Sequence, residues 1–97
     1  MIRSPQLPRV HLFVCANVRA DDNPLGPGCG EAGERVFKLL KEESLRRGMV
    51  HQVWVTKTFC MGICPKRGAT VARHAEDGRG IFRDVDESDA ITLLEDA

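Results

Sequence analysis

Four cysteines constrain this chain more than any other feature of its sequence. Cys15, Cys29, Cys60 and Cys64 follow the pattern C-x13-C-x30-C-x3-C within 97 residues. Four thiolates are the full ligand set of one metal site, and the last pair, in CMGIC, is close enough in sequence to hold a single metal ion. A fold that uses all four must bring distant segments of the chain to one place.

The length and charge narrow the classes of protein to which the chain could belong. Its 97 residues suffice for one domain with a modest core, which we take as residues 1–97 with a flexible N-terminus over 1–8. The 14 basic residues balance 14 acidic ones. This balance argues against a nucleic-acid binder, because such a protein needs a field of Lys and Arg over the phosphates.

The lack of an export signal and the presence of four cysteines both bear on the compartment in which the protein works. No stretch approaches the roughly 18 to 20 apolar residues that span a bilayer. The N-terminal MIRSPQLPR has prolines where a signal peptide needs an apolar run. We therefore expect a cytoplasmic protein with no membrane partner. In a reducing compartment, metal ligation or redox chemistry explains four cysteines better than disulfides do.

Two predicted strands each lead to a cysteine. Residues 9–15, RVHLFVC, alternate in a way typical of a strand that ends in Cys15. Residues 50–56, VHQVWVT, predict a second strand that ends just before Cys60. Its apolar centre predicts an internal strand covered on both faces, with Trp54 in the core. A position for Trp54 in a dimer interface is the alternative.

A helix is predicted between these strands. Residues 16–28, ANVRADDNPLGPG, have the composition of a loop that carries the chain from Cys15 to Cys29. The helix is expected near residues 30–47, because acidic residues suit its first turn and basic residues its last. Gly48 can adopt the left-handed conformation that ends it.

The rest of the chain predicts a hairpin and a second helix. Asp77-Gly78 is a turn signal between strands in residues 69–73 and 80–85. The final VDESDAITLLEDA predicts a short helix capped by Ser88 or Asp86. The predicted order is β-α-β-β-β-α, an α/β protein with a small mixed sheet of about four strands flanked by two helices.

Three kinds of site could use the four cysteines, which converge if the first two strands are parallel neighbours. Structural zinc sites usually take their ligands in two short knuckles, and only Cys60 and Cys64 have that spacing. A thioredoxin-type dithiol needs C-x-x-C, which is absent from the sequence. A 2Fe-2S cluster takes two thiolates on each iron, tolerates a long gap between ligand pairs and fits all four cysteines.

The sequence resembles the thioredoxin-like 2Fe-2S ferredoxins. The matching stretches are HLFVCANVR, CGEAGERVFKLLKEE, VWVTKTFCMGICPKRGATVAR and the hairpin and last helix with VDESDA. The resemblance covers residues 9 to 95. It implies a thioredoxin-like fold, usually a homodimer, with one 2Fe-2S cluster per subunit ligated by Cys15, Cys29, Cys60 and Cys64 in two surface loops.

The function expected from this resemblance is one-electron transfer to redox partner proteins that the sequence does not identify. We see no catalytic apparatus and expect an electron carrier, not an enzyme. Lys57, Lys66 and Arg67 are expected to favour reduction of the cluster. The alternatives are a structural zinc or cluster-dependent protein-interaction module, and an iron-sulfur redox sensor.

Overall fold

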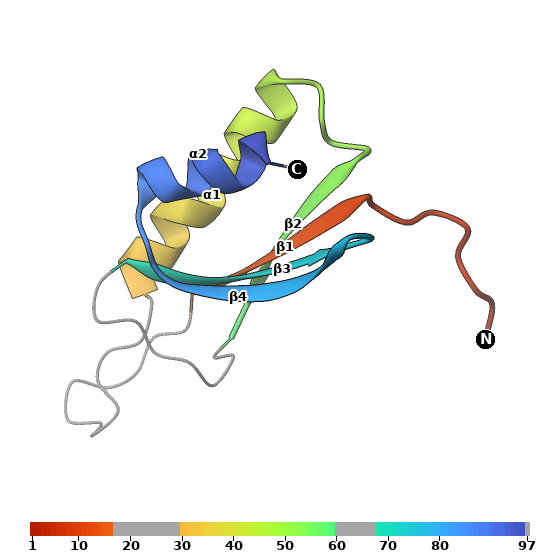
Figure 1. Ribbon diagram of the computed structural model, residues 1–97, viewed down its shortest axis with the longest axis horizontal. Helices are drawn as coiled ribbons and strands as arrows, with labels where there is room; N and C mark the ends of the chain where they lie inside the picture. Colours follow the sequence, from red (N-terminus) through yellow and green to blue (C-terminus); the bar gives the residue numbers. More distant parts are fainter. Residues whose placement is uncertain (17–29, 60–67, 97) are drawn as a thin grey trace.

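The fold is a two-layer arrangement of one sheet and two helices (Figure 1). The computed structural model describes residues 1–16, 30–59 and 68–96. The elements in these residues are β1 (Val10–Cys15), α1 (Gly30–Arg46), β2 (Val53–Thr58), β3 (Ala69–Ala75), β4 (Gly78–Val85) and α2 (Glu87–Glu95). The predicted order β-α-β-β-β-α is confirmed.

The four strands form one mixed sheet in the order β2-β1-β3-β4. β1 and β2 are parallel, whereas β3 is antiparallel to both β1 and β4. A parallel pair needs a crossover connection, and α1 supplies it. The predicted mixed sheet, with its parallel pair and added hairpin, is therefore confirmed.

Both helices lie on the same face of the sheet, where the hydrophobic core forms (Figure 1). Alternate residues of β1 point into this core, because successive side chains of a strand face opposite sides. They meet apolar side chains from both helices and the other strands. The fully buried large side chains there include Val10, Leu12, Val14, Val36, Leu40, Val71 and Leu94.

The position of β2 corrects one prediction. β2 is an edge strand and starts at Val53, because residues 50–52 form a turn after α1. Val53 and Val55 face the helices, but Trp54 lies on the opposite face and is 38% exposed. The prediction of an internal strand with Trp54 in the core is wrong. The run Val53 to Val55 is apolar on both sides, but only one side is covered by helices.

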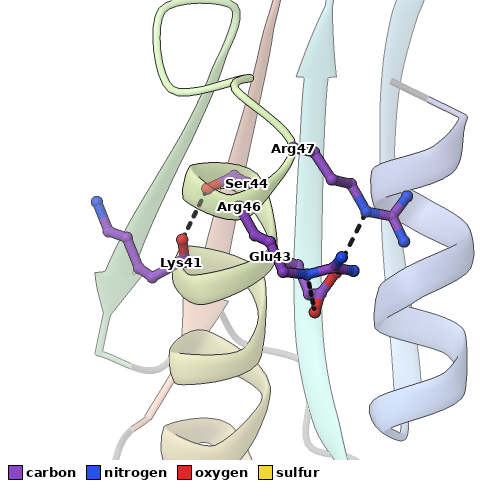
Figure 2. A network of polar contacts seen from close by, with 5 residues as sticks. All are labelled: Lys41, Glu43, Ser44, Arg46 and Arg47. Atoms are coloured by element: carbon purple, nitrogen blue, oxygen red, sulfur yellow. Dashed lines mark hydrogen bonds and ion pairs between the residues drawn. The ribbon is translucent and has the colours of Figure 1, made fainter.

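The C-terminal end of α1 is held by local hydrogen bonds (Figure 2). Glu43 accepts hydrogen bonds from the guanidinium groups of Arg46 and Arg47, and the Arg46 contact holds the pKa of the Glu43 carboxyl below its usual value. Gly48 has a φ of 70° and donates to the Leu45 carbonyl at 3.1 Å. This left-handed residue ends the helix as predicted.

The second helix begins with a capping box. The Asp86 carboxylate accepts from the Asp89 amide at 2.8 Å, and the Asp89 carboxylate accepts from the Asp86 amide at 3.2 Å. Of the two predicted caps, Asp86 is the one used. Ser88 instead donates its hydroxyl to the Asp86 carboxylate.

The hairpin is also confirmed. Ala75 pairs with Gly78, which leaves Glu76 and Asp77 as the two-residue turn between β3 and β4. Gly78 has a φ of 141°, a conformation that side chains rarely adopt. A β-bulge follows, where Ala69 pairs with Val85.

Candidate metal centre

Cys15 is the one predicted ligand within the described residues. It is the last residue of β1, it is 2% exposed, and within the described residues its thiol forms no disulfide. Cys29, Cys60 and Cys64 lie outside the residues that the structure describes. The described residues that flank them nevertheless show where the chain approaches each of these cysteines.

The parallel pairing of β1 and β2 places the end of β2, which leads to Cys60, beside Cys15. Cys15 is the register partner of Thr58, the last residue of β2, and the Ala16 amide donates to the Thr58 carbonyl at 3.0 Å. Cys60 follows Thr58 by two positions in the sequence. The strand that leads to the third cysteine therefore ends directly beside the first one.

The antiparallel strand β3 starts at the same end of the sheet. Val14 pairs with Val71, so the first residues of β3 lie beside the last residues of β1. β3 follows Gly68, four positions after Cys64. Figure 1 shows the end of β1, the end of β2 and the starts of β3 and α1 at one end of the sheet.

The first turns of α1 pack directly on the backbone of Cys15. A Cβ atom added at Gly33 would lie 2.0 Å from the Cys15 carbonyl oxygen and 2.9 Å from Cα of Ala16. Only a residue without a side chain allows this approach. Because α1 begins at Gly30, directly after Cys29, the helix start lies close to Cys15.

The electrostatics of this edge favour negative charge. The N-terminus of a helix carries a partial positive charge from its aligned peptide dipoles, and such a position stabilises thiolates. Lys57, a predicted cation near the site, donates to the Glu34 carboxylate at 2.9 Å and lies 5.3 Å from the centre of the Phe37 ring. Its charge is thus shared with a carboxylate of α1. Lys66 and Arg67 fall outside the described residues.

The described part of the chain contains no cluster of metal-ligand side chains and no membrane-spanning helix. Within residues 1–16, 30–59 and 68–96, no three His, Cys, Asp or Glu side chains gather where they could hold a metal ion. In the same residues, no helix is long and apolar enough to cross a membrane. Any cluster of three or more such ligands must therefore include residues beyond those ranges.

Two positions at this edge were not singled out from the sequence. Gly33 permits the contact between α1 and Cys15, and Thr58 sets the register beside Cys15. Gly33 carried a usable signal, because a glycine inside a helix is unfavourable relative to alanine and suggests close packing. Thr58 carried none, since register depends on how two distant strands pair.

No family model and no curated protein matches the sequence. Among solved structures, the wild-type thioredoxin-like 2Fe-2S ferredoxin from Aquifex aeolicus matches with a TM-score of 0.74 and 27% identity, covering 92% of this chain and 84% of that one. A cysteine-to-serine variant of the same ferredoxin matches with a TM-score of 0.75 and 25% identity, covering 89% and 83%.

The chain has the fold of the thioredoxin-like 2Fe-2S ferredoxins. The likeness spans most of both chains, so it concerns the whole ferredoxin-like fold and not one motif. This confirms the family resemblance predicted from the cysteine pattern. Within this fold, Cys15 lies at the end of the sheet where the flanking residues of the other three cysteines approach.

Proposed function

We propose that this protein is a one-electron carrier that holds one 2Fe-2S cluster through Cys15, Cys29, Cys60 and Cys64. The observation that carries the proposal is the pairing of Cys15 with Thr58 at the end of parallel strands, in a fold whose solved neighbours are 2Fe-2S ferredoxins. Parallel strands end at one edge, so the approaches to the first and third cysteines coincide. The sequence spacing then supplies two thiolates for each iron.

The residues present fit such a cluster. Cys15 is buried by protein atoms, which limits access of water to its sulfur. The close contact at Gly33 brings the positive end of α1 toward the anionic site. When bound, the cluster supplies the one-electron chemistry, and the four cysteines would hold it.

Several finer predictions belong to this proposal. The protein passes electrons between redox partners that are still unidentified, acts as a carrier and not an enzyme, and works in the cytoplasm. The homodimer predicted from the family resemblance is also part of it. The neighbouring ferredoxins support the carrier role.

Anaerobic reconstitution tests the occupant of the site. We expect a red-brown protein with about two irons and two sulfides per chain, an electron paramagnetic resonance signal after reduction, and a reversible one-electron wave in voltammetry. A colourless protein with one tightly bound zinc would establish the structural zinc module instead. An intact cluster without a reversible couple would refute electron transfer and favour the sensor.

Serine substitutions test the ligands. Cys15→Ser, Cys60→Ser and Cys64→Ser should each lose or weaken the cluster, because a neutral hydroxyl replaces an anionic thiolate. Ala16→Ser is the matched control, since it introduces the same side chain one residue from Cys15 without removing a thiol. Unchanged iron content and visible absorbance in Cys15→Ser would show that this thiol is not a ligand.

A further inference from the structure

The two edge strands of the sheet differ in how well they are protected against pairing with a further strand. Within the described residues, β2 and β4 each pair with one neighbour only. β4 carries charged side chains at Arg79, Arg83 and Asp84, and a bulge interrupts its pairing with β3. Edge charges and bulges of this kind hinder the addition of a strand. β2 instead begins with the uncharged run Val-Trp-Val-Thr, which has high β-propensity and contains no glycine or proline.

The backbone of β2 presents hydrogen-bonding groups along its free edge. The Gln52 carbonyl accepts from the Val10 amide at 3.1 Å, and the Thr58 carbonyl accepts from the Ala16 amide. Peptide groups point alternately to the two sides of a strand, so the amides and carbonyls of Val55 and Lys57 point away from β1. In the described part of the chain, no strand lies on that side of β2. An added strand would find donors and acceptors there.

A groove of about 460 Å³ runs along this free edge, beside the last turns of α1. Trp54 and Val55 face opposite sides of the sheet and both line the groove, so it follows the edge of the strand. Its apolar walls include Leu45, Val50 and Trp54, which are 69%, 40% and 38% exposed. Large apolar side chains are therefore accessible where an added strand would lie.

Lys41 gives the groove a positive charge. Its ammonium lies 5.8 Å from the centre of the Phe37 ring and pairs with no carboxylate of the described residues. Glu42, which also lines the groove, lies 4.0 Å from the ammonium of Lys38. Figure 2 shows the Lys41 side chain pointing away from Glu43. An acidic side chain in the groove would therefore be complementary to Lys41.

This charge favours a segment of another protein over a second copy of the chain. β2 contains no acidic residue, so two copies paired edge to edge would bring Lys41 no carboxylate from either strand. The complementary occupant is an extended segment that combines large apolar residues with at least one acidic residue.

We propose that an extended segment of a partner protein adds to the free edge of β2 as a fifth strand. Its backbone pairs with the free groups of β2, its apolar side chains cover Leu45 and Trp54, and its acidic side chain faces Lys41. In this mode of recognition, main-chain hydrogen bonds supply affinity and side-chain contacts supply specificity. The inference goes beyond electron transfer and holds whether or not the cysteines bind a cluster.

The position of the groove separates this docking site from the candidate metal centre. The groove lies beside the last turns of α1, whereas the first turns of α1 pack on Cys15. A segment bound along the groove therefore leaves the cysteine end of the sheet uncovered.

A synthetic peptide, TVDVLT with blocked ends, tests the site on the reconstituted full-length chain. In an extended strand its Asp and Leu lie on one face, to meet Lys41 and Leu45, and its two Val on the other, to meet Trp54. We expect a saturable rise in the fluorescence anisotropy of the fluorescein-labelled peptide. The unlabelled peptide should shift the emission of Trp54, the sole tryptophan, to shorter wavelength, because the added strand covers it.

Substitutions in the groove test its side-chain contacts. Leu45→Ala and Trp54→Ser should each raise the dissociation constant about fivefold or more, because each removes apolar area that the peptide covers. Ile81→Ser is the matched control, since Ile81 is 52% exposed on the other edge strand, and it should leave the constant unchanged. Lys41→Gln should raise it about two- to fivefold. Asn in place of the peptide Asp should cost wild type as much and cost the Lys41→Gln variant nothing further.

Backbone N-methylation distinguishes strand addition from side-chain docking. Two versions of the peptide, methylated at alternate amides, keep all side chains but each lose the donors of one edge. We expect one version to bind at least tenfold more weakly and the other to bind like the parent peptide, because only one edge faces β2.

Each outcome decides the proposal. An absence of saturable binding, an equal loss in Ile81→Ser, or equal affinities of the two methylated peptides would overturn it. Sedimentation velocity without peptide tests the second copy, since a dimer that Leu45→Ala and Trp54→Ser dissociate would place that copy in the groove and also overturn the proposal. Visible absorbance in the same samples distinguishes loss of the cluster from loss of peptide binding.

Discussion

Replacing Gly33 by alanine probes the contact between α1 and Cys15 directly. The added Cβ would lie 2.0 Å from the Cys15 carbonyl oxygen, whereas real Cβ contacts stay beyond 3.0 Å. The helix start and the end of β1 must therefore separate by about 1 Å. Backbone atoms lie on both sides of this contact, so no side-chain rotation relieves it.

Two effects of opposite sign set the change in the free energy of unfolding that Gly33→Ala causes. Alanine is a better helix former than glycine by about 1 kcal/mol, which favours the variant. Overpacking a close contact costs about 1–3 kcal/mol, and more where backbone must move. Because both partners here are backbone, we expect the clash to dominate and the free energy of unfolding to fall by about 2 kcal/mol.

Urea unfolding followed by far-ultraviolet circular dichroism measures this change, on the apoprotein and on the reconstituted protein. Gly80→Ala is the matched control, since a Cβ there meets only the Phe82 ring at 3.5 Å, an ordinary contact. We also expect Gly33→Ala to release iron to a chelator faster than the control, because Cys15 shifts with its carbonyl. A Gly33→Ala protein as stable as the wild type would refute the close packing of α1 on Cys15.

Three further predictions concern the rest of the fold. Leu40→Ala should lower the free energy of unfolding in urea by about 2–5 kcal/mol, because Leu40 is fully buried; Leu45→Ala, on the 69% exposed Leu45 of the same helix, should change it by less than about 0.5 kcal/mol. Asp86→Ala should lower the urea midpoint at pH 7, and this loss should shrink in acid. The helix amide holds the pKa of Asp86 low, so its contribution disappears as pH falls through that pKa. An NMR titration should place the His11 pKa below the ordinary value of about 6.5, and His74→Gln should raise it; no rise would contradict the proximity of the two rings.

α1 and β2 differ in how far their local sequence determines their place in the fold. The helix from Gly30 to Arg46 and its end at Gly48 were predictable, because apolar periodicity, terminal charges and a left-handed glycine are all local signals. In contrast, whether other elements cover one face of β2 or both was not predictable from the sequence. Val53, Trp54 and Val55 are apolar on both sides, but strand order determines whether a second layer covers them.

For the candidate metal centre, the sequence by itself determined the spacing of the four cysteines and predicted them as the donors. Four thiolates spaced as C-x13-C-x30-C-x3-C favour two irons over one zinc, and local patterns placed Cys15 at the end of a strand. Only the tertiary structure decided that Cys15 pairs with Thr58, that α1 contacts its backbone at Gly33, and that Trp54 lies on an open face. The reason is physical: thiolate chemistry and helix ends depend on neighbouring residues, whereas register and burial depend on segments that meet only after folding.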